Sequence, residues 1–256
     1  MDLGFNLRAA SSYSSPAQRA RVLTESWVES EIYCPNCGRA SIERYPNNTP
    51  VGDFFCPKCR EQFELKAKQD SFGRKIVDGE YHTMLRRLRS NEVPNLFALT
   101  YDMQRGSVLD MVVIPSQFFV PAIIERRKPL ALTARRAGWM GCNILISEIP
   151  KAGRVNLVTK GIPNSKPQVL SAWRRTLFLR DQTHLEMRGW ALDVMRYIEK
   201  LKSSEFTLAD IYRFEQELQK IRPNNRHIKA KIRQQLQVLR DAGYLEFQGR
   251  GNYRVV

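Results

Sequence analysis

Residues 51–68, VGDFFCPKCREQFELKAK, carry the pattern on which the interpretation of this chain depends. An extended segment, a Cys-Pro-Lys-Cys turn and a second extended segment predict a β-hairpin. Side chains alternate between the two faces of a strand, so Glu64 and Lys66 lie on one face of the second arm. Pairing of the two arms brings Asp53 alongside them. The hairpin therefore places two carboxylates and an amine in one small region.

Two matched cysteine pairs accompany the hairpin. Cys34 and Cys37 form one C-x₂-C knuckle, and after 18 intervening residues Cys56 and Cys59 form another, a spacing typical of structural zinc sites. Four thiolates close a tetrahedral shell around zinc and leave no position for water or substrate. Four buried free cysteines are the alternative. Cys142 stands alone and is expected to be a small buried hydrophobe.

The hairpin also has the residue types of a metal-dependent nuclease. Proteins hold Mg²⁺ with a few carboxylates plus water and phosphate, and we expect Asp53 and Glu64 to be its ligands. Lys66 would orient or help deprotonate the attacking water and stabilise the developing negative charge. Asp-x₁₀-Glu-x-Lys is a loose pattern, and a solvated strand face is the alternative. The adjacent cysteine knuckle in a basic protein favours the catalytic interpretation.

The net charge indicates a polyanionic partner. The 256 residues include 41 Lys and Arg against 26 Asp and Glu, a net charge of +15, which favours nucleic acid over an anionic membrane surface. The most apolar stretches, such as Val108–Pro115 and Phe118–Ile124, are far shorter than the roughly 20 residues of a membrane-spanning helix. The N-terminus lacks the apolar region of a secretory signal, so we expect a cytoplasmic protein.

Hydrophobic periodicity predicts an α/β core with a mixed sheet, followed by a second domain. The segment from Pro163 to about Met187 lacks clean periodicity and places a boundary near 180–188. We therefore expect a nuclease domain at 1–187 and a DNA-binding domain at 188–256. The helices and strands expected in the core, besides the hairpin, are Ala17–Ser30, Gly79–Ser90, Leu96–Tyr101 and Val108–Ile114.

The C-terminal part has the element order of a winged helix, a relative of the helix-turn-helix. Thr207 to Asp210 resembles a capping box that opens the second of three helices. The final residues, YLEFQGRGNYRVV, alternate on both sides of a GRGN turn and predict a hairpin. The expected helices are Trp190–Leu201, Leu208–Lys220 and Asn225–Ala242, the last with an apolar stripe of Ile228, Ile232, Leu236 and Leu239.

Basic residues in both parts are candidates for DNA contact. In the first part the cations lie close to an aromatic that is either a groove contact or core: Arg126, Arg127, Arg135, Arg136 and Trp139. In the second part the third helix and the hairpin tip supply Asn225, Arg226, Lys229, Arg233 and Arg250, because such a helix enters the major groove. A solvated basic face is the alternative for either set.

Four stretches of the chain resemble the DpnI family of methyl-directed restriction endonucleases. They are YCPNCG together with VGDFFCPKCREQFELKAK, ALTARRAGWMGCNI, FTLADIYRFE and HIKAKIRQQLQVLR, so the resemblance spans the whole chain. It implies a PD-(D/E)XK nuclease fold with an inserted Cys₄ zinc knuckle and a C-terminal winged helix. It also implies Mg²⁺-dependent cleavage of GATC that carries N6-methyladenine, with both domains recognising the methylated site.

By this resemblance Asp53, Glu64 and Lys66 are catalytic, and the four knuckle cysteines bind zinc. One departure is Gly52, which stands where the family motif has proline. We expect a monomeric type II deoxyribonuclease that acts on adenine-methylated double-stranded DNA and does not bind membranes. The alternative is a non-catalytic regulator with a zinc ribbon and a winged helix, which would need no Asp53, Glu64 and Lys66 set.

Overall fold

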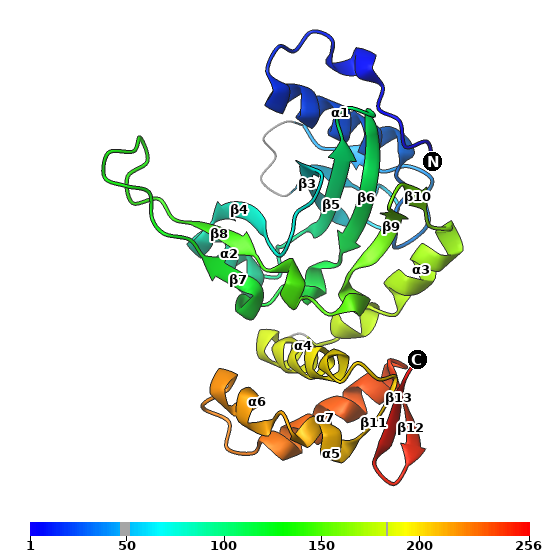
Figure 1. Ribbon diagram of the computed structural model, residues 1–256, viewed down its shortest axis with the longest axis vertical. Helices are drawn as coiled ribbons and strands as arrows, with labels where there is room; N and C mark the ends of the chain where they lie inside the picture. The colour runs from blue at the N-terminus through cyan, green and yellow to red at the C-terminus, as the bar shows by residue number, and fades with distance from the viewer. Residues whose placement is uncertain (47–51, 183) are drawn as a thin grey trace. The chain divides into compact units, whose positions relative to one another are not determined.

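The computed structural model describes residues 1–46, 52–182 and 184–256. Val51, the first residue of the predicted hairpin, lies outside the described residues. The chain forms two compact units, which are described separately (Figure 1). The first comprises Met1–Ser147 and Lys151–Thr176, and the second comprises Glu148–Pro150 and Leu177–Val256.

A mixed sheet forms the centre of the first unit, as predicted. β3 and β5 are parallel, whereas the other neighbouring strands are antiparallel. In the part of the chain that the structure describes, the sheet has seven strands in the order β1 (Glu43–Arg44), β2 (Phe54–Phe55), β3 (Gln62–Gln69), β5 (Asn95–Asp102), β6 (Ser107–Ile114), β9 (Val155–Thr159) and β10 (Ile162–Pro163).

The predicted hairpin is confirmed by the antiparallel pairing of β2 and β3, in which Phe54 lies opposite Phe63. Phe63 is fully buried and stacks on Phe97 of β5, with 4.4 Å between ring centroids. Because neighbouring residues of a strand point to opposite faces, burial of Phe63 directs Glu64 and Lys66 to the other face.

A second, smaller sheet has the order β4 (Ile76–Glu80), β8 (Gly141–Ile144) and β7 (Ile124–Arg126). β4 was not predicted, because Asp78, Gly79 and Glu80 have little intrinsic strand preference. Pairing with β8 stabilises β4, with Asp78 opposite Cys142 and an irregular register between Asp78 and Glu80. This sheet carries an acidic side chain to the predicted catalytic strand, as described below.

In the described part of the first unit, three helices accompany the sheets: α1 (Pro16–Glu31), α2 (Tyr81–Arg89) and α3 (Lys166–Arg174). α2 begins after the Glu80 carboxylate, which accepts hydrogen bonds from the His82 and Thr83 N–H groups. α3 was not predicted, because Pro163–Pro167 indicated a linker. Proline is tolerated in the first turn of a helix, and fully buried Trp173 holds α3 in place. Short 3₁₀ turns occur at Leu7–Ala10, Ser116–Phe118, Pro121–Ile123, Ile146–Glu148, Lys151–Gly153 and Leu177–Leu179.

The second unit has the predicted helices followed by a hairpin. Its helices are α4 (Leu185–Lys200), α5 (Leu208–Tyr212), α6 (Glu215–Ile221) and α7 (Ile228–Asp241). Its sheet has the order β11 (Glu205–Thr207), β13 (Asn252–Val255) and β12 (Leu245–Gly249).

The Thr207 capping box is confirmed, since Thr207 and Asp210 exchange hydrogen bonds at the start of α5. One prediction was wrong: the single helix from Leu208 to Lys220 is divided into α5 and α6 at Phe214. The Phe214 ring packs on Tyr197 of α4, with 4.7 Å between centroids, so tertiary packing overrides the continuous helical pattern.

The four predicted apolar residues of α7 are all buried, which confirms the face that the helix turns to its core. Among the described residues, every helix is too short or too polar to cross a bilayer.

Candidate active site and nucleic-acid interface

The two cysteine knuckles form one cluster. Their four sulfur atoms lie within 4.8 Å of one another, with 3.5 Å between the Cys34 and Cys59 Sγ atoms and 3.6 Å between those of Cys37 and Cys56. Four Zn–S bonds of about 2.3 Å in a tetrahedron separate the sulfurs by about 3.8 Å. The cluster therefore fits a closed zinc shell, in agreement with the sequence prediction.

The same local backbone geometry occurs in both knuckles. In each, the N–H of the first cysteine donates to the carbonyl five residues later: Cys34 to Arg39 and Cys56 to Glu61. The fourth residue after that cysteine adopts a left-handed backbone, with φ of 72° at Gly38 and 63° at Arg60. This turn brings two thiols to one side of the chain, which explains the C-x₂-C spacing.

Polar side chains link the knuckles to the sheet and to α3. Glu61 accepts hydrogen bonds from Asn36 in the first knuckle and from Asn95 of β5, and the Trp173 indole N–H donates to Asn36. Burial raises the pKa of the Cys34 thiol well above its ordinary value, so a nearby metal cation would favour the thiolate form. These contacts tie the cluster to β5 and α3, while the second knuckle lies directly between β2 and β3, next to Asp53 and Glu64.

The structure brings Asp53 close to β3. Its main-chain N–H donates to the Phe63 carbonyl, and its Oδ2 accepts the Leu65 N–H at 2.7 Å. Leu65 stands between Glu64 and Lys66, so this bond fixes the Asp53 carboxylate beside both. A Cβ atom on Gly52 would lie 3.0 Å from the Phe63 carbonyl oxygen. Glycine at the position of the motif proline therefore allows the close approach of this segment to β3.

Lys66 lies between two carboxylates. Its Nζ is 2.6 Å from Glu64 Oε1 and 2.8 Å from Oδ1 of Asp78 on β4. Burial lowers the pKa of Lys66, but the charges of Glu64 and Asp78 outweigh burial and raise it. Sequence reasoning missed Asp78, since β4 belongs to another sheet. The only available signal was an acidic residue between two apolar residues and a glycine.

A metal site at this position would use two carboxylates. Among the described residues, the four cysteines are the one group of three or more closely spaced metal-ligating side chains. Asp53 and Glu64 would therefore hold Mg²⁺ together with water and substrate phosphate, which agrees with the preference of Mg²⁺ for retaining waters. The residues present fit the metal that the resemblance implies.

The basic segment of the first unit projects from the small sheet as an arm, Arg127–Met140, between β7 and β8 (Figure 1). Arg135 and Arg136 are exposed in its turns. The Arg127 N–H donates to the Gly141 carbonyl and the Leu130 N–H donates to the Trp139 carbonyl, and these two bonds close the base of the arm. Leu132 near its end is 92 % exposed. The arm thus presents cations and an apolar side chain to the surroundings.

The predicted residues at the base of this arm point to two faces. Arg126 lies opposite Cys142, which lies opposite Asp78, so Arg126 shares the face of Asp78 and Lys66. Cys142 is fully buried, as predicted. The partly exposed Trp139 indole instead lies against Gly141, and a Cβ atom there would be 3.0 Å from two ring atoms.

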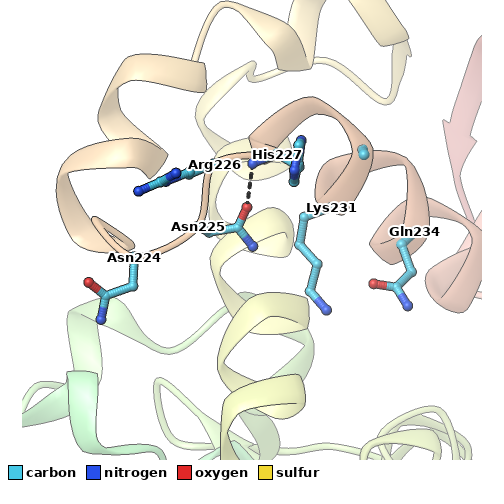
Figure 2. A pocket seen from close by; sticks show the side chains of 7 residues that line it. Asn224, Asn225, Arg226, His227, Lys231 and Gln234 are labelled. Atoms are coloured by element: carbon cyan, nitrogen blue, oxygen red, sulfur yellow. Dashed lines mark hydrogen bonds between the residues drawn. The ribbon is translucent and has the colours of Figure 1, made fainter.

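An open pocket of about 580 Å³ lies at the start of α7 (Figure 2). Two of its lining residues, Asn225 and Arg226, were predicted to contact DNA. Asn225 accepts a hydrogen bond from the His227 N–H at 2.8 Å. The lining residues that were not predicted are Asn224, His227, Ala230, Lys231 and Gln234. Ala230, Lys231 and Gln234 share one face of α7, whereas Asn224 and His227 lie before the helix begins.

The other predicted residues of this unit lie outside the pocket lining. Lys229 forms an ion pair with Glu215 of α6 at 3.2 Å and lies over the Tyr212 ring, so it also joins α7 to its neighbours. Arg233 is exposed on α7. Arg250 is exposed at the hairpin tip, between two glycines, and has a left-handed backbone with φ of 48°.

Comparison with protein families agrees with this arrangement. Residues 1–182 match the model of the Dam-replacing family, DpnI, and residues 186–255 match that of the Dam-replacing HTH domain. The second match covers α4 to β13 almost completely and confirms a C-terminal helix-turn-helix domain. The first covers both sheets, the cysteine cluster and the Asp53, Glu64 and Lys66 set. The chain therefore belongs to the Dam-replacing (DpnI) family.

Proposed function

We propose that this protein is a methyl-directed restriction endonuclease that hydrolyses double-stranded DNA at GATC sites containing N6-methyladenine, with Mg²⁺ as the catalytic metal. The observation that carries the proposal is the grouping of Asp53, just before β2, with Glu64 and Lys66 of β3, beside a cysteine cluster that fits zinc. Residues 1–187 would form a PD-(D/E)XK nuclease domain and 188–256 a winged helix. We propose that the protein acts in the cytoplasm, where it can reach DNA. We also propose that it acts as a monomer.

In this proposal Asp53 and Glu64 hold Mg²⁺, which when bound supplies positive charge to the attacked phosphodiester. The Leu65 N–H keeps the Asp53 carboxylate oriented. Lys66 donates hydrogen bonds to the attacking water and to a phosphate oxygen that gains negative charge. The water oxygen forms a bond to phosphorus as the bond to the leaving oxygen breaks; the attacking water gives up one proton to surrounding water, and the leaving oxygen takes one from surrounding water.

Recognition of DNA is assigned to both units. Arg126, on the face of Asp78, is placed to meet a phosphate near the reacting one, and Arg127, Arg135 and Arg136 meet the backbone farther along. The N6-methyl group projects into the major groove and is apolar, so Trp139 is our candidate for its contact. In the second unit the pocket residues of α7 and Arg250 at the hairpin tip approach the duplex.

The test uses plasmid DNA with and without adenine methylation at GATC, incubated with the full chain and Mg²⁺. We expect cleavage of methylated plasmid only, and none when a chelator removes Mg²⁺. Binding without any cleavage would identify the non-catalytic regulator instead. Equal cleavage of both plasmids would contradict methyl dependence.

A further inference from the structure

Asp78 is a buried carboxylate whose partner is the predicted catalytic lysine. Its side chain is 6 % exposed, and its Oδ1 lies 2.8 Å from Lys66 Nζ. A carboxylate so far removed from water requires a charged or hydrogen-bonding partner to remain ionised. The contact joins β4 of the small sheet to β3 of the large one, so it fixes Lys66 from outside its own hairpin.

The cross-strand neighbours of Asp78 do not compete with Lys66 for its carboxylate. Cys142 lies opposite Asp78 on β8, and burial raises the pKa of its thiol to about 12. At neutral pH the Cys142 side chain is therefore uncharged. Arg126, the next residue in this cross-strand row, is exposed, so its charge faces solvent.

The Lys66 ammonium is shared between two carboxylates at similar distances, Glu64 Oε1 and Asp78 Oδ1. Each attracts Nζ in its own direction, and the observed position is a balance between them. If Asp78 lost its charge, Nζ would be drawn toward Glu64 alone. The Lys66 ammonium would then neutralise the Glu64 carboxylate, which the metal needs as a ligand. It would also leave the position from which it can reach water and phosphate.

We propose that Asp78 is a positioning residue, which holds the Lys66 ammonium between itself and Glu64 so that Glu64 stays available to the metal. This inference rests on the proposed nuclease function. Asp78 acts through Lys66 and is not itself a ligand or a base.

The first test compares Asp78→Asn, Asp78→Glu and a matched control, Asp110→Asn. Asp110 lies on β6, accepts the Lys160 N–H and is not part of the proposed site, so its variant makes the same chemical change elsewhere in the unit. Single-turnover cleavage of methylated plasmid is measured at saturating Mg²⁺, with KM measured separately.

We expect Asp78→Asn to lower the cleavage rate roughly ten- to hundredfold, since small displacements of a catalytic group have effects of this size, with KM within about twofold of the wild type. Asp78→Glu should recover part of the rate, and Asp110→Asn should cleave normally. A wild-type rate in Asp78→Asn, or a loss confined to KM, would overturn the proposal.

The second test needs neither cleavage nor metal. Thermal unfolding is measured for Asp78→Asn, Lys66→Met and the double variant, because residues in contact show non-additive effects. Asp78→Asn should change Tm when Lys66 is present and have little further effect in the Lys66→Met background. Additive changes would show that Asp78 stabilises the fold through other contacts, against the proposal. Failure of the wild type to cleave any DNA would refute the proposed function, whereas this cycle would still test the contact.

Discussion

Asp53 is held by bonds that do not depend on its charge. Its main-chain N–H and carbonyl bond to Phe63 and Tyr45, and only its carboxylate reaches the Leu65 N–H. An amide at this position keeps one oxygen acceptor and the same shape. Replacement by asparagine therefore separates the chemistry of this side chain from its contribution to the fold.

We predict that Asp53→Asn and Lys66→Ala each abolish cleavage while DNA affinity stays close to that of the wild type, because phosphate contacts elsewhere remain. Plasmid cleavage and DNA binding in a fluorescence anisotropy assay provide the two measurements. Full cleavage by either variant would remove that residue from the catalytic set.

Trp139 offers a second test, on methyl recognition. We predict that Trp139→Ala lowers the ratio of cleavage rates on methylated over unmethylated GATC by about tenfold or more, the usual scale of about 1–3 kcal/mol for one base-edge contact. Gly141→Ala should lower the same ratio with the indole still present, because the new Cβ would lie 3.0 Å from the ring. An unchanged ratio in stable variants would assign methyl recognition to other residues, and an unfolded Trp139→Ala would show that the indole is core.

A zinc ion in the cysteine cluster would connect metal binding to the folding of a whole hairpin. We predict about one zinc per chain by metal analysis, and a large loss of both zinc and cleavage activity in Cys56→Ser. Cys142→Ser is the matched control, since Cys142 is buried apart from the cluster, and it should retain zinc. Stoichiometric zinc and normal activity in Cys56→Ser would contradict the structural role.

The loop before α7 depends on one arginine. Arg222 donates to Asp193 of α4 through Nε and Nη2, at 2.9 and 2.7 Å, and lies over the Trp190 ring. Gly189 makes room for it, because a Cβ atom there would be 2.5 Å from Nη2. This contact fixes the end of the loop that carries Asn224 to His227.

We predict that Arg222→Met lowers the free energy of unfolding by roughly 1–3 kcal/mol, because the buried Asp193 carboxylate loses two charge-assisted hydrogen bonds and keeps Arg196 as its partner, and that it also weakens DNA binding. Arg213→Met is the control, since Arg213 forms an exposed pair with Asp210 and should change stability by less than about 1 kcal/mol. Urea denaturation measures both. Equal stability of the two variants would contradict the anchoring role.

Features that depend on neighbouring residues could be predicted from the sequence, whereas features that depend on contacts between distant segments could not. The hairpin, the cysteine spacing and the buried stripe of α7 follow from short-range periodicity and were predicted. The break at Phe214 depends on Tyr197 of α4, and the contact of Asp78 with Lys66 depends on two separate sheets. Such contacts between distant segments leave no periodic signal, so the sequence analysis missed them.

We propose that both units bind DNA, each through its own basic residues. The net charge of +15 predicts affinity that falls steeply with salt concentration, because bound cations release counterions from the phosphates. The pocket at the start of α7 contributes Arg226 and Lys231 to this surface.

We predict that the double variant Arg226→Ala, Lys231→Ala in the full chain weakens DNA binding and reduces the slope of log affinity against log salt by about 1–2. Lys220→Ala on α6, outside the pocket lining, should leave the slope within error of the wild type. The preference for methylated over unmethylated cleavage should persist, because Trp139 is intact. An unchanged slope would show that these cations face solvent and not phosphate.

The shortness of β2 has a consequence for the whole molecule. With only Phe54 and Phe55 in this strand, and one main-chain hydrogen bond to either side from Asp53 and Cys56, few contacts set its alignment with β3. If β2 paired with β3 one residue out of register, its side chains would move to the opposite face of the sheet, and Asp53 would point away from Glu64. A zinc ion that ties Cys56 and Cys59 to the first cysteine pair would favour the correct register of β2 against β3. The zinc content of a preparation should therefore report the fraction of molecules in which these strands are aligned for catalysis.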